Sequence, residues 1–176
     1  MMFVILSACR DRVQLEDRGF VLALGIDLQD NKIVVTACEA GSNDKEVQSI
    51  KKGLGNNFTE AFSDANKNTN KKLYIGHMKV VVFGKNLIEN QICAEEILKE
   101  LERADLSRKI IVLAAEKTAA DEIKDPRDGQ NFGAYVSKYF KNNHIKAKTL
   151  EEAIDDAWHG KKIKETITYK LPSKGK

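Results

Sequence analysis

Residues 73–83 have the sequence LYIGHMKVVVF, and this run predicts a central β-strand that stops at Gly84. Its β-branched and aromatic side chains are of the kinds enriched in strands. The following segment, Leu87–Arg103, gathers its apolar residues near one face and its charges largely elsewhere, which predicts an amphipathic helix. Lys109–Ala115 is largely apolar and predicts a second buried strand. A strand, a helix and a strand in this order favour a right-handed crossover between parallel neighbours.

Two apolar runs earlier in the chain predict an antiparallel hairpin. Gly19–Asp27 and Lys32–Cys38 are joined at Gln29-Asp30-Asn31, where Asp and Asn tolerate the positive φ of a hairpin turn. Lys45–Lys52 predicts a weaker third strand. Residues 53–58, GLGNNF, resemble the start of a dinucleotide-binding loop, but a phenylalanine stands at the position of the third glycine. This segment therefore predicts a turn.

Further helices are predicted from apolar spacing and from residues suited to helix caps. Thr149-Leu150-Glu151-Glu152 is a capping box, with threonine at the cap and glutamate three residues later. The remaining predicted elements are helices from Thr59, over 118–123 and over Phe132–Phe140, and a last strand over Ile163–Tyr169. The sequence therefore predicts an α+β fold, in which a mixed β-sheet has an N-terminal antiparallel hairpin and helices packed on it.

The length and charge of the chain limit what it can be. Its 176 residues suit one domain with a proper hydrophobic core. Lys and Arg number 29 and Asp and Glu number 26, which leaves a formal net charge of +3 with both signs well mixed. Because no basic face is interleaved with aromatic residues, we expect no nucleic-acid partner. Six lysines between Lys161 and Lys176 form a basic tail, either an ordinary solvated end or a contact for phosphate or anionic lipid.

The sequence lacks the short motifs of common catalytic and cofactor sites. It has no Gly-x-x-x-x-Gly-Lys-Ser/Thr phosphate loop and no Gly-x-Ser-x-Gly elbow. His77, His144 and His159 lack the spacing of metal ligands, so we expect no metal site and no cofactor. An imidazole within an apolar strand must find a partner or titrate near neutral pH. His77 is therefore either a satisfied structural histidine or the catalytic residue of a hydrolase.

Two acidic pairs need no catalytic role either. Asp27 with Asp30 lies in the predicted hairpin, and Asp155 with Asp156 lies on the predicted helix after Thr149. Solvation explains both pairs without general acid–base work. We therefore expect a protein that is not an enzyme.

The start of the chain carries a lipoprotein-like pattern. Leu6-Ser7-Ala8-Cys9 ends an uncharged apolar opening, and small residues followed by cysteine suit a signal peptidase and a lipidated thiol. Only eight residues precede Cys9, fewer than a basic region and an apolar region of a signal need, so we expect a truncated or misassigned start. The alternative is a short buried strand over Met2–Ala8. Nothing after Ala8 approaches the roughly 18 apolar residues of a membrane-spanning helix.

The two other cysteines are expected to be structural. Cys38 lies in an apolar stretch and Cys93 lies on a helical pattern, so each is expected to behave as a small buried hydrophobe. A disulfide between them is the alternative, and it needs an oxidising compartment.

Several segments occur together in an order found in a known family. They are Cys9-Arg10-Asp11-Arg12, Leu15-Glu16-Asp17, residues 20–27, residues 72–84 with a Gly-His-x-Lys element, an arginine at Arg103, and a strand ending at Ala114-Ala115. As a set, from Cys9 to about Pro172, they resemble the C subunit of spore germinant receptors, a lipoprotein family of endospore-forming bacteria. Members of that family are longer than this chain and have further domains downstream.

The resemblance implies a domain division and a membrane location. Residues 1–8 would be the remnant of a lipoprotein signal peptide, 9–172 the N-terminal domain of a germination-type lipoprotein, and 173–176 a loose basic tail. Lipid on Cys9 would hold the chain at a membrane, which in the family is the spore inner membrane. The implied partners are a multi-pass membrane subunit and a second membrane subunit of the receptor, which senses nutrients and triggers germination.

The expected function is therefore that of a membrane-tethered, non-enzymatic interaction domain. The resemblance also implies His77, Lys79 and Arg103 as structural or partner-contact residues. The alternative function is a lipoprotein that binds a small solute or a peptide in a cleft on the sheet.

Overall fold

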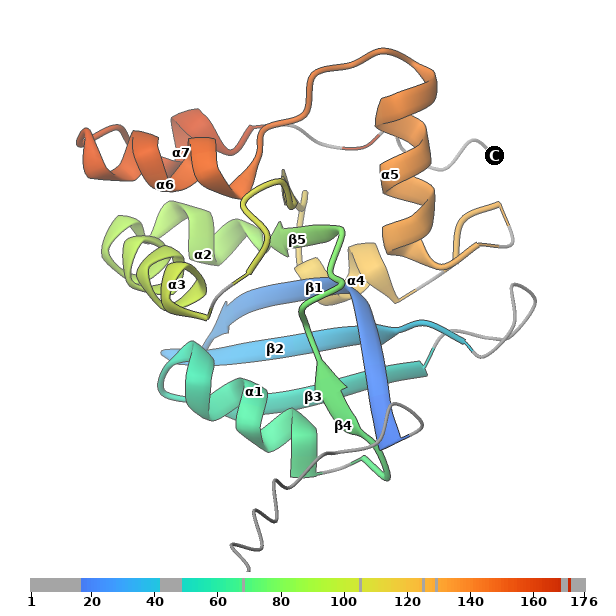
Figure 1. Ribbon diagram of the computed structural model, residues 1–176. Helices are drawn as coiled ribbons and strands as arrows, with labels where there is room; N and C mark the ends of the chain where they lie inside the picture. Colours follow the sequence, from blue (N-terminus) through green and yellow to red (C-terminus); the bar gives the residue numbers. More distant parts are fainter. Residues whose placement is uncertain are drawn as a thin grey trace, which may run out of the picture.

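A computed structural model describes residues 17–41, 49–67, 69–104, 106–124, 126–128, 130–168 and 171. Within them, six strands form one mixed sheet with helices on both faces (Figure 1). The strands are β1 (Arg18–Gln29), β2 (Lys32–Glu39), β3 (Ser49–Gly55), β4 (Lys72–Tyr74), β5 (Val80–Phe83) and β6 (Ile111–Ala114). The helices are α1 (Phe58–Lys67), α2 (Lys85–Glu89), α3 (Gln91–Arg103), α4 (Ala119–Ile123), α5 (Phe132–Asn142), α6 (Leu150–Trp158) and α7 (Ile163–Thr166).

The strand order is β3-β2-β1-β5-β6, and β4 pairs separately with β1. The first three strands are antiparallel, whereas β4 and β5 run parallel to β1 and β6 runs parallel to β5. Asp30 and Asn31 turn the β1–β2 hairpin with φ of 48° and 58°, as their short polar side chains allow. The predicted α+β fold, hairpin and parallel strand–helix–strand unit are thus confirmed.

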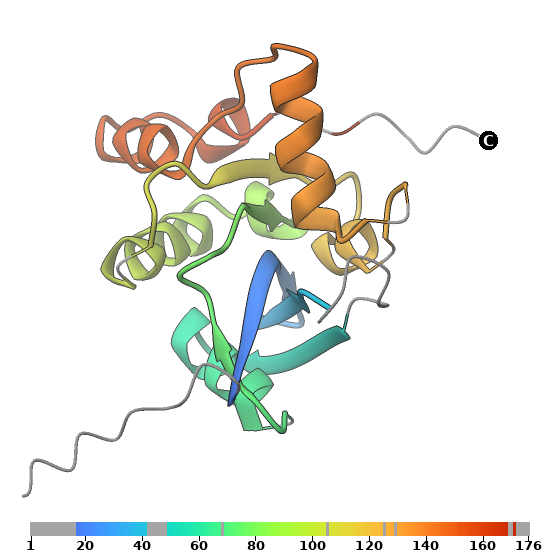
Figure 2. The ribbon, with the colours of Figure 1, turned by 45° about the vertical axis from the view of Figure 1, so that its right-hand side comes forward.

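Side-chain alternation along the strands builds a core on each face of the sheet. In β5, Val81 and Phe83 join one apolar cluster while Val80 and Val82 join the other. The first cluster includes residues of α1, α2, α3, α6 and α7, and the second includes residues of α4 and α5. Figures 1 and 2 show α1 beside β3, with α6 and α7 toward the other end of the molecule. Both faces of β5 are therefore buried.

The predicted strand over residues 73–83 is wrong in its middle. It is divided into β4 and β5, which pair with β1 at Phe20↔Tyr74 and at Ala23↔Val80. Between these pairs β1 has only two residues, whereas the partner segment has five, from Ile75 to Lys79. The surplus residues leave the sheet in a turn, in which the Met78 amide donates to the Ile75 carbonyl at 3.0 Å.

Other element boundaries also differ from the prediction. The single helix over Leu87–Arg103 is interrupted at Asn90, whose side chain caps α3 by accepting from the Cys93 amide at 3.1 Å. The last strand predicted over Ile163–Tyr169 is wrong, because its described part contains α7. The third strand, predicted over Lys45–Lys52, lies at Ser49–Gly55. The capping box at Thr149 is confirmed, with Thr149 at the cap of α6.

The predicted turn at residues 53–58 is also wrong in its first half, because Gly53 and Gly55 belong to β3. These glycines allow α1 to lie directly on the strand. A Cβ atom added to Gly53 would lie 2.1 Å from the Ala61 carbonyl oxygen and 2.2 Å from the Ala65 amide nitrogen. Close helix–strand packing, rather than a turn, therefore accounts for glycine at this position.

The two described cysteines are both free thiols, so the alternative of a disulfide is wrong. Cys38 is fully buried, and Asn131 Nδ2 donates to its Sγ at 3.1 Å. Burial raises the pKa of the Cys38 thiol to about 12, which keeps it protonated. Cys93 lies on α3 and is partly buried. Cys9, the predicted signal remnant at 1–8, the alternative strand over Met2–Ala8 and the predicted tail at 173–176 lie outside the described residues.

Candidate contact surfaces

The start of β1 and the short strand β4 form a two-stranded parallel ribbon with one buried and one outward face. Their register pairs Arg18 with Lys72 and Phe20 with Tyr74. Paired residues of a parallel ladder project to the same side, so these four side chains share a face. The residue between them on β4, Leu73, is 4% exposed and packs in the core. The ribbon is thus amphipathic, with a basic row and an aromatic row turned outward.

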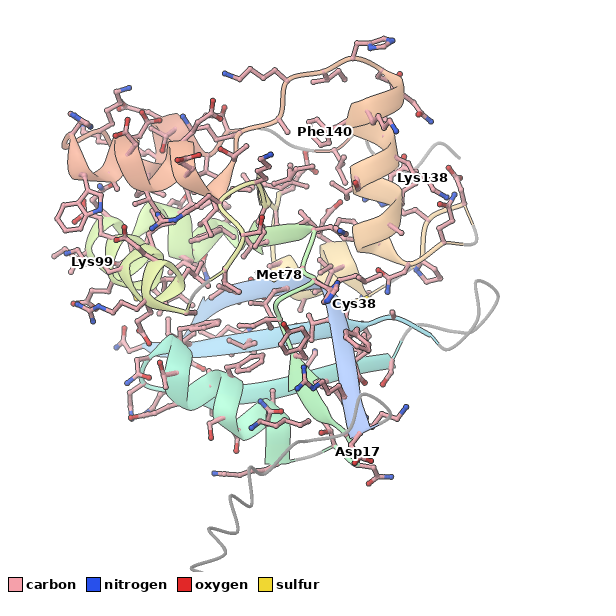
Figure 3. All side chains as sticks on the ribbon, in the orientation of Figure 1. Asp17, Cys38, Met78, Lys99, Lys138 and Phe140 are labelled. Carbon is pink, nitrogen blue, oxygen red and sulfur yellow. The ribbon has the colours of Figure 1, made fainter. Side chains whose placement is uncertain are left out.

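His77, from the turn between β4 and β5, extends the aromatic row. Its ring lies 5.3 Å from Phe20 and 5.7 Å from Tyr74, measured between centroids, and the Phe20 pair is edge-to-face. The Arg18 guanidinium lies 5.0 Å from the centroid of the Tyr74 ring, a cation–π geometry. We call Arg18, Phe20, Lys72, Tyr74 and His77 the β1–β4 patch. Figure 3 labels Asp17 at this end of β1, away from α6 and α7.

A groove lies between α1 and the β4 side of the molecule. Its volume is about 620 Å³, and its apolar lining comes from Phe58, Phe62, Ile75 and Ala104. Polar lining residues are Thr59, Ser63, Asn66, Thr69, Asn70, Lys71 and Lys72. The groove therefore combines apolar and polar groups, as sites for small molecules do.

Arg103 lies on a neighbouring hollow of about 700 Å³, between the last turns of α3 and the start of α1. The Glu100 carboxylate in this hollow accepts from the Phe58 and Thr59 amides at 3.2 and 3.0 Å and from the Thr59 hydroxyl at 2.7 Å. A carboxylate at a helix N-terminus satisfies amides that have no partner within the helix. Glu100 thus fixes α1 to α3, and Arg103 is exposed beside it.

The surface of α3 and α6 exposes two large apolar side chains. Trp158 is 66% exposed and Ile92 is 73% exposed. Trp158 borders a cavity of about 220 Å³ that is also lined by Glu95 and Lys99. Ile92 lies one helical turn before Glu95 on α3, on the same side of the helix. We call this the α3–α6 surface, and its exposed Trp and Ile are of the kind found at protein contacts.

Asp27 is 3% exposed, so the prediction that solvation explains it is wrong. Its two carboxylate oxygens accept from the Ala119 and Ala120 amides at 2.7 and 3.0 Å, at the start of α4. Burial raises the pKa of Asp27, and these two backbone hydrogen bonds oppose that shift. Gly84 lies against the same carboxylate, since a Cβ atom there would meet Asp27 Oδ1 at 1.9 Å. Asp27 therefore joins β1 to α4.

The second acidic pair is also not explained by solvation alone, because Asp156 is 7% exposed. Lys148 and Lys161 both pair with its carboxylate, the latter at 2.7 Å. The Lys148 and Lys161 ammonium groups lower the pKa of Asp156. Asp156 thus links α6 to the segment before it, through Lys148, and to the segment after it, through Lys161. The adjacent Asp155 is exposed, as predicted.

The lowered pKa of Asp156 predicts how its variant responds to pH. A carboxyl whose folded pKa is depressed stabilises the fold above its unfolded pKa of about 3.9, and that contribution is lost as pH falls through the folded value. Asp156→Asn should therefore lower the free energy of unfolding by about 1 kcal/mol at pH 7, with little difference from wild type near pH 2. Urea titrations across this range measure it. Asp155→Asn is the control, and an equal loss there would contradict the prediction.

Comparison with known proteins decides the family. A family model described as the spore germination protein N-terminal domain matches residues 11–172. The chain belongs to this spore germination protein family. It is also similar to spore germination protein KC of Bacillus subtilis (strain 168), with 25% identity over 68% of this chain and 33% of the relative's length. The chain thus spans about a third of that curated relative. No solved structure matches the chain significantly.

Within this germination-family domain, the residues expected as contacts fall on two surfaces. His77 belongs to the β1–β4 patch, and the exposed Lys79 follows two residues later, where its amide donates to the Leu22 carbonyl at 2.9 Å. Arg103 lies elsewhere, at the end of α3, so the three residues do not form one cluster. The sequence analysis did not single out Trp158 and Ile92, because a helical period marks an apolar stripe but not the residue that a neighbour leaves uncovered.

The described part of the germination-family chain offers little for catalysis by His77. The imidazole is exposed and, in the described segments, contacts the Phe20 and Tyr74 rings and forms no hydrogen bond. The hypothesis of a hydrolase required a neighbouring nucleophile, and this environment does not supply one. Over the same residues, no group of three or more His, Cys, Asp and Glu is placed to hold a metal ion. No helix in the described ranges is long and apolar enough to span a bilayer.

Proposed function

We propose that the chain is a lipoprotein subunit of a spore nutrient germinant receptor, held at the membrane by lipid on Cys9 and acting without catalysis. The observation that carries the proposal is the position of the family match. It begins at residue 11, two residues after the cysteine of Leu6-Ser7-Ala8-Cys9, so the germination-family domain follows closely on the lipoprotein-like pattern. The similarity to a spore germination protein of Bacillus subtilis agrees with this role.

The proposed mechanism is placement followed by contact. Two or more acyl chains on one residue hold a protein stably at a bilayer, since each buried methylene contributes about 0.8 kcal/mol. Confinement at the membrane raises the effective concentration of the domain beside membrane subunits, so weak protein contacts suffice. Ile92 and Trp158 on the α3–α6 surface support a contact there, because large exposed apolar side chains are enriched at such sites. The nutrient signal would pass through that contact.

The test uses the complete gene in the native spore-forming host. In the Cys9→Ala variant we expect loss of the diacylglyceryl mass, transfer of the protein from the detergent phase to the aqueous phase, and slowed germination. Trp158→Ala should keep the lipid and the detergent partitioning but also slow germination. Leu54→Ala, which removes an exposed apolar side chain from β3, is the matched control. Normal germination of the Cys9→Ala strain would overturn the proposal.

The groove beside α1 favours a second candidate function, binding of a small solute or peptide. Phe58, Phe62 and Ile75 offer apolar contacts there, and Asn66 and Lys72 offer polar ones. A ligand present at 100 times its dissociation constant should raise the free energy of unfolding by about 2.7 kcal/mol. Thermal shifts with a panel of amino acids, sugars and short peptides measure this, and Phe62→Ala should abolish any shift. A panel without any shift would remove this candidate.

A further inference from the structure

We propose that the β1–β4 patch binds anionic lipid headgroups at the surface of the bilayer. The inference rests on the proposed function in one respect, because lipid on Cys9 would turn this end of the domain toward the bilayer. The binding itself is argued from the residues of the ribbon. Arg18 and Lys72 form the basic row, and Phe20, Tyr74 and His77 form the aromatic row. A surface with cations beside amphipathic rings matches the headgroup region, where phosphates meet the outer acyl chains.

A β-bulge explains why this face remains open to solvent. The register of β1 against β2 shifts between Val21 and Ala23. In a regular strand, side chains three positions apart point to opposite faces. Val21 and Leu24 nevertheless belong to the same core cluster, because the bulge between them reverses the alternation. Beyond the bulge the first turn of α5 covers the strand, where a Cβ atom added to Gly133 would lie 2.4 Å from the Leu22 carbonyl oxygen. Arg18 and Phe20, which precede the bulge, keep their outward positions on the ribbon.

The basic side chains of this region lack carboxylate partners among the residues that the structure describes. Across the described ranges, Arg18, Lys72 and Lys79 form no ion pair with a carboxylate, whereas lysines elsewhere, such as Lys148 and Lys161, do. The guanidinium of Arg18 is instead held over the Tyr74 ring at 5.0 Å, which leaves its N–H donors available. A guanidinium can bind phosphate oxygens through two parallel hydrogen bonds. Charge complementarity therefore favours a phosphate-bearing surface.

The position of the β1–β4 patch relative to Cys9 agrees with binding to lipid headgroups. Eight residues lead from Cys9 to Asp17, and a fully extended chain of that length spans at most about 28 Å. Asp17 directly precedes the ribbon, at the end of the molecule away from α6 and α7 (Figure 3). A lipid on Cys9 would thus hold this end near the bilayer and leave the α3–α6 surface for protein contacts. Electrostatic attraction to the headgroups acts within about 8 Å at physiological salt, so the patch must approach closely.

The test uses the full 176-residue chain with Cys9→Ala, so that no lipid contributes to binding. Flotation is measured with vesicles of phosphatidylcholine alone and with vesicles containing about 30% phosphatidylglycerol, which gives the vesicle surface a negative potential. Neutral vesicles report every contribution that does not depend on charge, including that of the apolar residues 1–8. We expect stronger binding to the anionic vesicles, and this difference should shrink as salt is raised.

Two double variants that each remove two positive charges show whether the β1–β4 patch is the part of the surface that binds. Each Lys or Arg near an anionic membrane is worth about fivefold in affinity, so Arg18→Gln with Lys72→Gln should weaken binding to anionic vesicles at least tenfold. Lys99→Gln with Lys138→Gln removes the same charge from α3 and α5 and should change it little. Tyr74→Ala should weaken the binding that persists at high salt.

Three outcomes would overturn the proposal. They are equal binding of the parent chain to both vesicle types, full binding by the Arg18→Gln, Lys72→Gln variant, and an equal loss in the Lys99→Gln, Lys138→Gln control. Because every arm lacks lipid on Cys9, these outcomes are independent of whether Cys9 is lipidated in the host. Circular dichroism of each variant confirms that a loss of binding is not a loss of fold.

Discussion

Asp27→Ala is expected to lower the free energy of unfolding by about 3 kcal/mol, because it leaves two buried amides at the start of α4 without an acceptor. Each buried backbone N–H left unpaired costs about 1–3 kcal/mol, and hydrogen bonds to a charged acceptor are the stronger kind. The Ala119 and Ala120 amides have this one carboxylate as their partner in the described part of the chain. Chemical denaturation followed by circular dichroism measures the loss.

A double-mutant cycle with Gly84 shows whether the carboxylate is the cause. Gly84→Ala places a methyl group against Asp27 Oδ1 and should destabilise wild type by about 1–3 kcal/mol, as overpacking does. In the Asp27→Ala background the same methyl group fills vacated space and should cost much less. Asp27→Asn keeps the size but offers a single oxygen, so an intermediate loss is expected. Additive effects of the two substitutions would contradict this account of the site.

Gly53→Ala should be nearly as damaging, because the added methyl group would meet main-chain atoms of α1. The obstructing atoms are the Ala61 carbonyl oxygen and the Ala65 amide nitrogen, at 2.1 and 2.2 Å from the new Cβ. Backbone atoms cannot rotate aside, so α1 must move away from β3, and we expect a loss of about 3 kcal/mol. The groove beside α1 should also change shape.

The control for Gly53 is its neighbour Leu54, which is 54% exposed on the other face of β3. Leu54→Ala should change the free energy of unfolding by less than about 0.5 kcal/mol. Thermal unfolding of the two variants under one set of conditions makes the comparison. A Gly53→Ala protein as stable as wild type would show that α1 can be displaced from β3 without cost.

Features that depend on local chemistry were predictable from sequence. The capping box at Thr149 involves residues three positions apart, and the hairpin turn at Asp30 needs only the tolerance of Asp and Asn for positive φ. The β-branched and apolar content of the chain likewise predicted the buried runs that form β5 and β6. Such signals lie within one element, so no knowledge of tertiary partners is required.

Features that depend on distant partners were not predictable. The division of the strand over residues 73–83 is set by β1, which offers too few residues opposite Ile75–Lys79. The burial of Asp27 depends on amides 92 and 93 positions away. An acidic residue beside a turn is usually solvated, and the helix start that buries this one is invisible from its neighbours. The β1–β4 patch likewise appears only when residues 18–20 and 72–77 are placed together.

The central position of β1 has a mechanical consequence. Arg18 to Gln29 is the first described strand, yet it lies between β2 and β5 rather than at an edge of the sheet. A pull directed along β1 from its N-terminal end would load its hydrogen bonds to β2 and to β5 in shear. A strand at an edge of the sheet, loaded along the same axis, would present hydrogen bonds to one neighbour only. We therefore expect β1 to resist a pull along its axis more strongly than an edge strand of the same length would.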